Sequence, residues 1–161
     1  MYKYETHLHT KEGSACSSAP AADMARVHKA AGYDGIFVTD HFFNANTAVP
    51  RDLPWEDRVD RYFLGYEHAK EVGDEIGLKV WFGCEFTVYN ADFLIYGMEK
   101  DWMKANEELL MHTDERVLFS KLRNELDCFI VHAHPFRHAS YIHHISLYPY
   151  DVDAVETINA S

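Results

Sequence analysis

The sequence predicts an α/β domain, and two observations support that prediction. Near-continuous apolar runs of strand length recur along the chain, and amphipathic stretches with helical spacing lie between them. Strands that are apolar on both faces are typical of parallel sheets covered by helices. The 161 residues, 47% of them hydrophobic, contain no internal repeat or linker. We therefore expect one folded domain spanning residues 1–161.

Six segments are expected to form strands. A first strand ends at the histidines of "ETHLHT", and five more are expected at residues 35–42, 79–86, 92–97, 127–135 and 153–159. The weaker segment 92–97 follows 79–86 closely enough to be its hairpin partner.

Three stretches between these strands are expected to form helices. Residues 17–32 begin with serines and a proline and end at Gly32, which suits a helix start and stop. Residues 55–77 place apolar side chains along one stripe. Residues 113–127 open with Thr113 as the expected cap and with carboxylates in the first turn, where the helix dipole favours them. The alternation of strands and helices predicts right-handed βαβ units.

The charge balance restricts the class of partner. With 26 acidic residues against 15 basic ones, the formal net charge is −11. Affinity for a nucleic-acid backbone depends on Lys and Arg, so a long nucleic-acid partner is not expected. A small phosphorylated molecule would have to be held locally, by metal ions and a few chosen cations.

Neither a signal peptide nor a membrane span is expected from the sequence. The opening "MYKYETHLHTKEG" lacks a basic start followed by an apolar stretch, and the apolar runs are too short to cross a bilayer. Cys16, Cys84 and Cys128 are widely spaced and form no CxxC pair, which favours a reducing cytoplasm over a disulfide framework. A cytoplasmic protein is therefore expected. Cys16 lies near the first histidine pair and could be a metal ligand, but a small buried residue is the favoured interpretation.

Residues able to bind metal follow the ends of the expected strands. His7 and His9 are two apart, which puts them on one face of a strand about 6–7 Å apart. The later strand ends carry Asp40 and His41, then Glu85, then His132 and His134. In parallel α/β barrels these ends form one rim, where functional residues collect. Singly, Glu85 could be an ordinary strand-end carboxylate, His41 a cap and His132 a buried core histidine; together the residues predict a metal site. His138, His143 and His144 follow in a loop, and their role is open.

The expected ligand types indicate which metals and which chemistry. Imidazoles with a carboxylate suit Zn²⁺, Mn²⁺ or Fe²⁺ better than Ca²⁺ or Mg²⁺, which prefer oxygen ligands. A carboxylate such as Glu85 can bridge two ions roughly 3.5–4 Å apart, a geometry that clamps both oxygens of a phosphoryl displacement. A bound water whose pKa falls toward ~7 supplies the nucleophile. No serine or cysteine nucleophile is then needed.

With these residues in place, the sequence resembles the PHP family, the polymerase and histidinol phosphatase domain. The matching pieces are "HLHT" with "SACSS" close behind, "GYDGIFVTDHF", "GCEFTV" and "VHAHPF", in the family's order and over nearly all of the chain. The resemblance implies a distorted (β/α)7 barrel with two or three divalent metal ions (zinc, manganese or iron) at the carboxyl ends of its strands. It also implies hydrolysis of phosphoesters.

The resemblance assigns roles by position. It makes His7, His9, Glu85 and His134 metal ligands, with Glu85 as the bridge, and gives His41 to a third ion where one exists. Asp40 would act in catalysis by orienting His41 from behind. The expected substrate-binding residues are His132, Arg137 and, less strongly, Lys11, with the planar guanidinium of Arg137 able to grip two phosphate oxygens.

Three departures from the family pattern are visible. The strand pair after Glu85 offers Asp92 and Glu99 where the family has a histidine. Cys16 and its neighbours stand where trinuclear members have another histidine, and the late Asp-x-His pair is missing. The chain is therefore expected to be a truncated barrel, incomplete after residue 159, whose uncovered strand edge favours self-association.

The leading function is a cytoplasmic metal-dependent phosphoesterase that acts on a small phosphorylated molecule. The missing Asp-x-His pair favours a second interpretation, a degenerate domain that binds metal without catalysis. A 3′-exonuclease would use the same chemistry, but the acidic charge disfavours it. An amidohydrolase also opens its barrel with HxH, yet lacks this pattern of glutamate and His-Pro.

Overall fold

The structure, a computed structural model, describes residues 1–89, 91–137 and 144–159. In this part of the chain the strands are β1 (Tyr4–Leu8), β2 (Gly35–Val38), β3 (Lys79–Val88), β4 (Ala91–Tyr96), β5 (Phe129–Ala133) and β6 (Ala154–Val155). The helices are α1 (Ala21–Ala30), α2 (Trp55–Ile76), α3 (Lys100–Ala105), α4 (Glu107–His112) and α5 (Glu115–Leu126). All six expected strands and all three expected helices are therefore present, with shorter bounds for most of them.

The strands form one sheet in the order β1-β2-β3-β4-β5-β6. The pairs β1–β2, β2–β3 and β5–β6 are parallel, whereas β4 is antiparallel to both β3 and β5. The expected hairpin between residues 79–86 and 92–97 is thus confirmed as the antiparallel pair β3–β4, and it makes an otherwise parallel sheet mixed, because a tight turn can join only antiparallel strands. Since β4 alone is reversed, the carboxyl ends of the other strands still meet at one edge.

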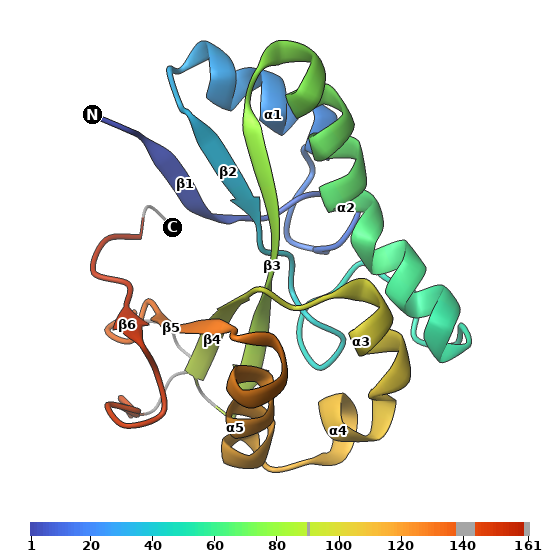
Figure 1. The fold of residues 1–161 in the computed structure, drawn as a ribbon, viewed down its shortest axis with the longest axis vertical. Helices are drawn as coiled ribbons and strands as arrows, with labels where there is room; N and C mark the ends of the chain where they lie inside the picture. The colour runs from blue at the N-terminus through green and yellow to red at the C-terminus, as the bar shows by residue number, and fades with distance from the viewer. Residues whose placement is uncertain (90, 138–143, 160–161) are drawn as a thin grey trace.

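The sheet is curled rather than flat, and β3 runs through both of its halves (Figure 1). The first residues of β3, Lys79–Phe82, pair with β2, and the later ones, Gly83–Val88, pair with β4. In Figure 1, α2, α3 and α4 lie to one side of the sheet and both chain ends lie to the other. A curled sheet with open edges at β1 and β6 among the described residues agrees with an incomplete barrel. The (β/α)7 arrangement and self-association at the edge stay predictions.

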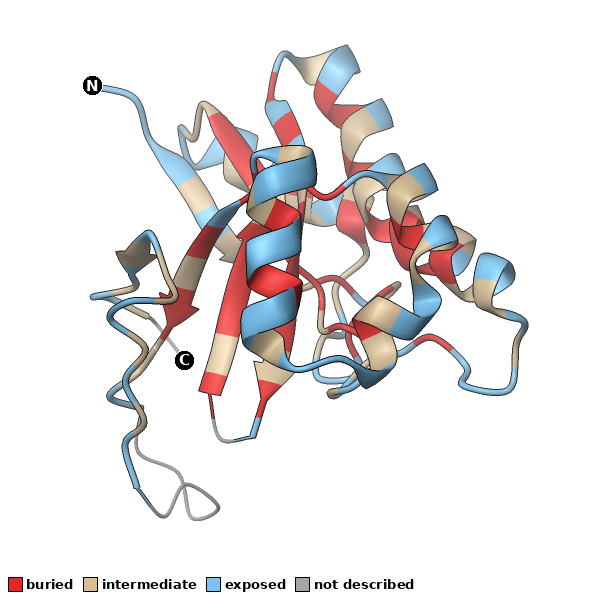
Figure 2. Ribbon diagram, turned by 60° about the horizontal axis from the view of Figure 1, so that its bottom comes forward, coloured by how far each residue is buried: buried red, intermediate tan, exposed pale blue. Residues whose placement is uncertain are grey.

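Two apolar clusters hold the helices on the sheet. One joins α1 and part of α2 to β1, β2 and the start of β3, around Ala25, Ile36 and Ala69. The other lies under α3, α4 and α5, around Phe93 and Leu118. Figure 2 shows the buried residues concentrated on the strands and on the helix faces turned toward them. This packing fixes the strand ends from which the site is built.

The helix ends differ from the sequence prediction in particular ways. Thr113 was the expected cap of α5, but Asp114 takes that position and its side chain accepts a hydrogen bond from the Arg116 backbone amide. The short helices α3 and α4 were not anticipated, because six residues are too few for a clear apolar period. Within the described ranges, none of the helices combines the length and apolar character that crossing a membrane requires.

Candidate metal centre

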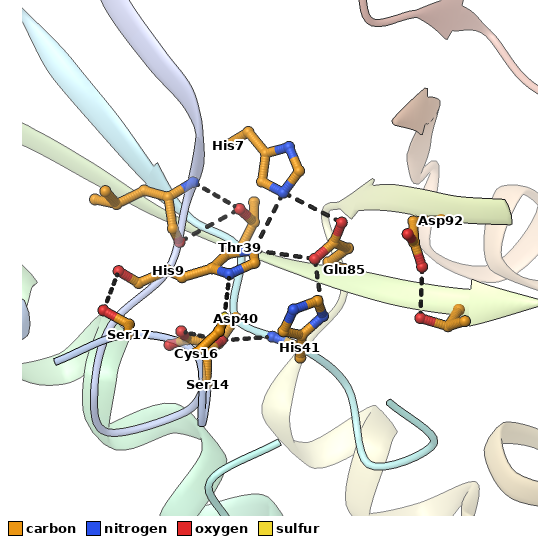
Figure 3. A network of polar contacts seen from close by, with 12 residues as sticks. His7, His9, Ser14, Cys16, Ser17, Thr39, Asp40, His41, Glu85 and Asp92 are labelled. Carbon is orange, nitrogen blue, oxygen red and sulfur yellow. Dashed lines mark hydrogen bonds and ion pairs between the residues drawn. The ribbon is translucent and has the colours of Figure 1, made fainter. Parts of the chain in front are cut away.

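Glu85 lies at the centre of four histidines, of which Figure 3 shows His7, His9 and His41. Its Oε1 is 3.3 Å from His7 Nε2 and 3.0 Å from His134 Nε2. Its Oε2 is 3.0 Å from His9 Nε2 and 2.8 Å from His41 Nδ1. Each carboxylate oxygen therefore faces its own pair of imidazoles. This is the arrangement needed for a carboxylate that offers one oxygen to each of two cations.

The four histidines come from the ends of three strands. His7 is in β1 and His9 follows it, His41 follows β2, and His134 follows β5. A β-bridge between His41 and Glu85 prolongs the β2–β3 pairing to the site. His134 has a φ of +27°, a backbone conformation that residues other than glycine adopt rarely and that is found most often at functional sites. The expected metal ligands are thus brought together, although their ligand roles remain a prediction.

Two carboxylates extend this cluster on the side of His134. Glu156 Oε1 is 3.2 Å from His7 Nδ1, and its Oε2 accepts a hydrogen bond from the His134 backbone amide at 2.8 Å. Asp92 Oδ2 lies 3.8 Å from His134 Nε2, and Asp92 accepts a hydrogen bond from Thr87. Sequence reasoning noted Asp92 but missed Glu156. The strand-end signal for Glu156 was hidden, because a strand was expected over residues 153–159, whereas β6 ends at Val155 and Glu156 directly follows it.

Cys16 extends the cluster on the opposite side. Its Sγ is 3.2 Å from His9 Nδ1, and Cys16, His9 and His41 can each present a ligand atom within 4.8 Å of the others. The favoured interpretation of Cys16 as a small buried residue is wrong, because its side chain is exposed. Partial removal of the thiol from water by its neighbours, together with the negative charges of Glu85 and Asp40, raises the pKa of Cys16. The thiol therefore stays protonated at neutral pH unless a cation lies beside it.

The electrostatics of the centre couple a carboxylate to cationic imidazoles. Burial would raise the pKa of Glu85, but the close contacts with four imidazoles outweigh it and hold that pKa below its usual range. Burial lowers the pKa of His7, yet its hydrogen bonds to Glu156 and Glu85 prevail and raise that pKa to about 9. Without a metal, His7 therefore carries a proton at neutral pH.

Two buried polar atoms support a cation at this place. Glu85 Oε2 and His41 Nδ1 have no partner in hydrogen-bonding geometry within the described ranges, although they lie only 2.8 Å apart. Leaving such atoms unsatisfied is costly unless an ion or water is held between them. The donors present are imidazoles, carboxylates and a thiol, a set that suits zinc, manganese or iron better than calcium or magnesium.

Asp40 acts on the site through a loop. Only 2% exposed, its carboxylate accepts hydrogen bonds from the backbone amide and hydroxyl of Thr10, both at 2.6 Å, and from Ser14 Oγ at 2.7 Å. Ser14 Oγ in turn accepts a hydrogen bond from the His41 backbone amide at 2.9 Å. Burial raises the pKa of Asp40 against these hydrogen bonds. The carboxylate thus positions His41 by way of Ser14, a more indirect role than the expected contact from behind.

The expected substrate-binding residues separate into two groups. Arg137 lines a cleft of about 870 Å³ that also contains Glu85 and its four histidines. Lys11 and His132 are not among the described residues that line it. His132 is 2% exposed and packs against Phe93 and Tyr148, with ring centroids 5.2 and 5.6 Å away. The packing argues against a substrate contact for His132, because its position in β5 turns it to the helix-covered face.

His138 and His143, whose role the sequence left open, lie outside the described residues. His144 is described and exposed.

Comparison with known proteins supports the fold. No family model and no curated protein matches the sequence. A two-domain protein from Bacteroides vulgatus that contains a predicted PHP-like metal-dependent phosphoesterase superposes with a TM-score of 0.68 at 15% identity, over 92% of this chain. A protein from Bifidobacterium adolescentis, assigned by prediction as a metal-dependent phosphoesterase, gives a TM-score of 0.54 at 12% identity over 96% of this chain. The chain spans 39% of the first structure and 77% of the second. At these identities the likeness concerns the fold alone, which is PHP-like.

Proposed function

We propose that this protein is a metal-dependent phosphoesterase that hydrolyses a small phosphorylated substrate. The observation that carries the proposal is Glu85, a buried carboxylate with a pair of histidines at each oxygen, at the base of an open cleft. The two PHP-like structural neighbours, each assigned to this activity by prediction, support the same class.

Two groups of residues would hold divalent ions. His7 and His134 lie toward Glu85 Oε1, with Asp92 and Glu156 beside these two histidines, and His9 and His41 lie toward Glu85 Oε2. Bound ions there would supply Lewis-acid polarisation of a phosphoryl oxygen and a water acidic enough to act as nucleophile. The protein's own contribution is to hold these side chains in a fixed geometry and to bury Glu85, which keeps solvent from its carboxylate.

The charge around the cleft indicates a small substrate. Arg137 is its only Lys or Arg among the described lining residues, and it would bind the phosphate by two parallel hydrogen bonds. Glu5, Glu156 and Asp92 line the same cleft as negative groups. A long polyanion would meet repulsion beyond the metal centre, which disfavours the 3′-exonuclease alternative.

A first experiment separates catalysis from metal binding alone. The protein, purified without added metal, is analysed for zinc, manganese and iron and then assayed on a panel of phosphomonoesters, nucleotides and a single-stranded oligonucleotide. We expect two or more equivalents of metal and turnover of a small phosphoester, both lost in Glu85→Gln. Bound metal without turnover of any phosphoester would favour the non-catalytic alternative. Shortening of the oligonucleotide alone would favour the exonuclease.

A further inference from the structure

Glu156 links the two edge strands of the sheet. It directly follows β6, and its carboxylate contacts His7, which lies in β1 at the other end of the strand order (Figure 1). The strands β1 and β6 do not pair with each other in the described part of the chain. The contact between Glu156 and His7 therefore joins the first and the last strand at the end of the sheet where Glu85 lies.

Both oxygens of Glu156 are engaged by donors. Oε1 lies 3.2 Å from His7 Nδ1, and Oε2 accepts a hydrogen bond from the His134 backbone amide at 2.8 Å. Asn159 Nδ2 donates to both oxygens at 3.2 Å and lies 3.3 Å from His7 Nδ1. The Glu156 backbone amide donates to the His132 carbonyl at 2.9 Å, and its side chain is only 11% exposed. The carboxylate is therefore fixed in place while it holds two other residues.

The two ring nitrogens of His7 meet different carboxylates. Nε2 is 3.3 Å from Glu85 Oε1, whereas Nδ1 faces Glu156. A histidine that binds a metal ion through one nitrogen donates a hydrogen bond through the other. An ion beside Glu85 Oε1 would bind Nε2, which leaves Nδ1 to donate to Glu156. Glu156 thus lies behind the imidazole, on the side away from the ion position.

The backbone of His134 depends on the same carboxylate. Its φ of +27° is a conformation that residues other than glycine keep only where surrounding contacts impose it. The hydrogen bond from the His134 amide to Glu156 Oε2 is such a contact. With this backbone, His134 Nε2 lies 3.0 Å from Glu85 Oε1, and the ring stacks on that of His7 with centroids 5.6 Å apart. Both imidazoles are therefore directed at one oxygen of Glu85.

Asp92, the other carboxylate beside His134, is placed differently. Its Oδ2 lies 3.8 Å from His134 Nε2, the nitrogen that faces Glu85. Asp92 can therefore share an ion with this nitrogen, whereas Glu156 contacts only the backbone amide of His134 among the contacts that the structure describes between the two residues.

We propose that Glu156 is a positioning residue, which orients His7 and His134 toward the ion position at Glu85 Oε1 without contacting the ion. The proposal rests on the proposed function in that the two histidines bind a divalent ion. Loss of a hydrogen-bond partner behind a metal ligand costs about ten- to a hundredfold in metal affinity. The other ion position, at Glu85 Oε2 beside His9 and His41, does not depend on Glu156.

Zinc affinity of Glu156 variants tests this role without an activity assay. A glutamine offers one acceptor oxygen to two donors, so Glu156→Gln leaves either the His7 ring or the His134 amide without its partner. Competition with a chromophoric chelator is expected to show that one of the bound zinc ions is weakened at least about tenfold in this variant. The affinity for the other ion is expected to change much less. Glu156→Asp, which keeps both oxygens on a shorter side chain, is expected to recover part of the loss.

Glu5→Gln is the matched control. It removes the same charge from the same cleft, but Glu5 Oε1 accepts a hydrogen bond from the backbone amide of His7, at 3.1 Å, rather than from its ring. Zinc affinity is therefore expected to fall much less in Glu5→Gln than in Glu156→Gln. An equal fall in the two variants would show that Glu156 acts through its charge alone, and would overturn the positioning role.

Nuclear magnetic resonance of the imidazole nitrogens gives a second readout, which a merely structural role would not move. In the zinc-loaded wild type, His7 is expected to bind zinc through Nε2 and to carry a slowly exchanging proton on Nδ1. Its signals are identified by their absence in His7→Gln. In Glu156→Gln, the Nδ1 proton of His7 or the amide proton of His134 is expected to exchange faster with water, whereas Glu5→Gln should change neither.

The outcomes separate this role from the proposed function. Zinc bound to His7 through Nδ1, or zinc affinities and exchange rates unchanged in Glu156→Gln, would overturn the positioning role even in a protein that hydrolyses phosphoesters. The expected losses in a protein that turns over no phosphoester would support the positioning role and overturn the proposed function. A wild-type protein that binds no zinc would overturn both.

Discussion

Glu85 Oε1 and His134 Nε2 lie 3.0 Å apart, although their residues come from β3 and from the end of β5, two strands that do not touch. The reversed strand β4 lies between them and pairs with both. Because β4 is antiparallel to each, β3 and β5 run in the same direction and present their carboxyl ends together. A hairpin thus allows two side chains on separated strands to reach the same point.

The position of Glu85 makes it the residue whose loss should remove the most metal. Glu85→Gln keeps the shape of the side chain but removes the charge that faces four imidazoles, so metal affinity at both proposed ion positions should fall by at least about tenfold. Inductively coupled plasma analysis of the folded, gel-filtered variant measures this. Glu67→Gln, an isosteric change at an exposed carboxylate paired with Lys100, is the matched control and should keep the metal.

The metal content of a His132 variant tests which of the two histidines in "VHAHP", His132 or His134, binds metal. His132→Asn should retain metal, because the imidazole packs on Phe93 outside the cleft. Equal metal content in Glu85→Gln and His132→Asn would contradict the assignment of His134 as the ligand from this strand.

Much of this fold follows from local pattern. The apolar runs locate the strands, and the strand-end rule brings His7, His9, His41, Glu85 and His134 into one cluster because each follows or ends a strand that runs the same way. This rule requires only knowledge of where each strand ends. It does not require the three-dimensional arrangement of the loops.

The features that sequence reasoning missed depend on loop and tertiary geometry. Cys16 reaches His9 only because Ser14 and Ser17 fold the loop back toward the strand, a path that no periodic pattern encodes. The two-residue alternation predicts that His132 and His134 share a face, but the positive φ of His134 breaks that alternation. Backbone strain at a single residue has no signature in hydrophobicity.

The metal-free protein should lose stability as pH rises above 6.5. The pKa of His7 is raised from 6.5 to about 9 in the folded protein, so folding is favoured by the proton that His7 holds. This contribution to stability is fully present below pH 6.5 and is lost as the pH rises through 9. Melting temperatures measured in EDTA should therefore fall from pH 6.5 to 9, and this fall should shrink in His7→Gln. With saturating zinc the trend should reverse, because metal ligands must be deprotonated to bind. A metal-free melting temperature that rises over this range would contradict the charged pair of His7 with Glu85 and Glu156.

Arg137 should contribute to substrate binding and Lys11 should not. Removing a guanidinium that donates to phosphate costs about 1.5–3 kcal/mol, so Arg137→Ala should raise KM about tenfold or more for a small phosphoester. Arg137→Lys should recover only part of this, since an ammonium group cannot bind two oxygens in the same planar way. Lys11→Ala is the matched control, because it removes an exposed cation outside the cleft. Steady-state kinetics with an aryl phosphate measure the KM of each variant. An equal rise in KM for Arg137→Ala and Lys11→Ala would show that positive charge attracts the substrate without a specific contact from Arg137.

Gly65 links the helix layer to the metal centre. It lies in the middle of α2, where replacing glycine by alanine ordinarily stabilises a helix by about 1 kcal/mol. Here a Cβ on Gly65 would lie 2.8 Å from Asp40 Oδ2 and would also press on the Thr10 hydroxyl. Overpacking of this kind costs about 1–3 kcal/mol, and the atoms displaced are those that hold the loop before Cys16.

Gly65→Ala should therefore reverse the ordinary helix preference. We expect the free energy of unfolding to fall by about 1–2 kcal/mol, measured by urea denaturation in EDTA. Glu71→Ala, at an exposed position of the same helix, should change it by no more than a few tenths of a kcal/mol. Zinc affinity should fall together with stability in Gly65→Ala but not in Glu71→Ala. The reason is that a displacement of Asp40 is passed through its hydrogen bond with Ser14 to the backbone of His41. A variant as stable as the wild type would mean that α2 can move away from Asp40, and that the loop is not held by the helix packing as argued.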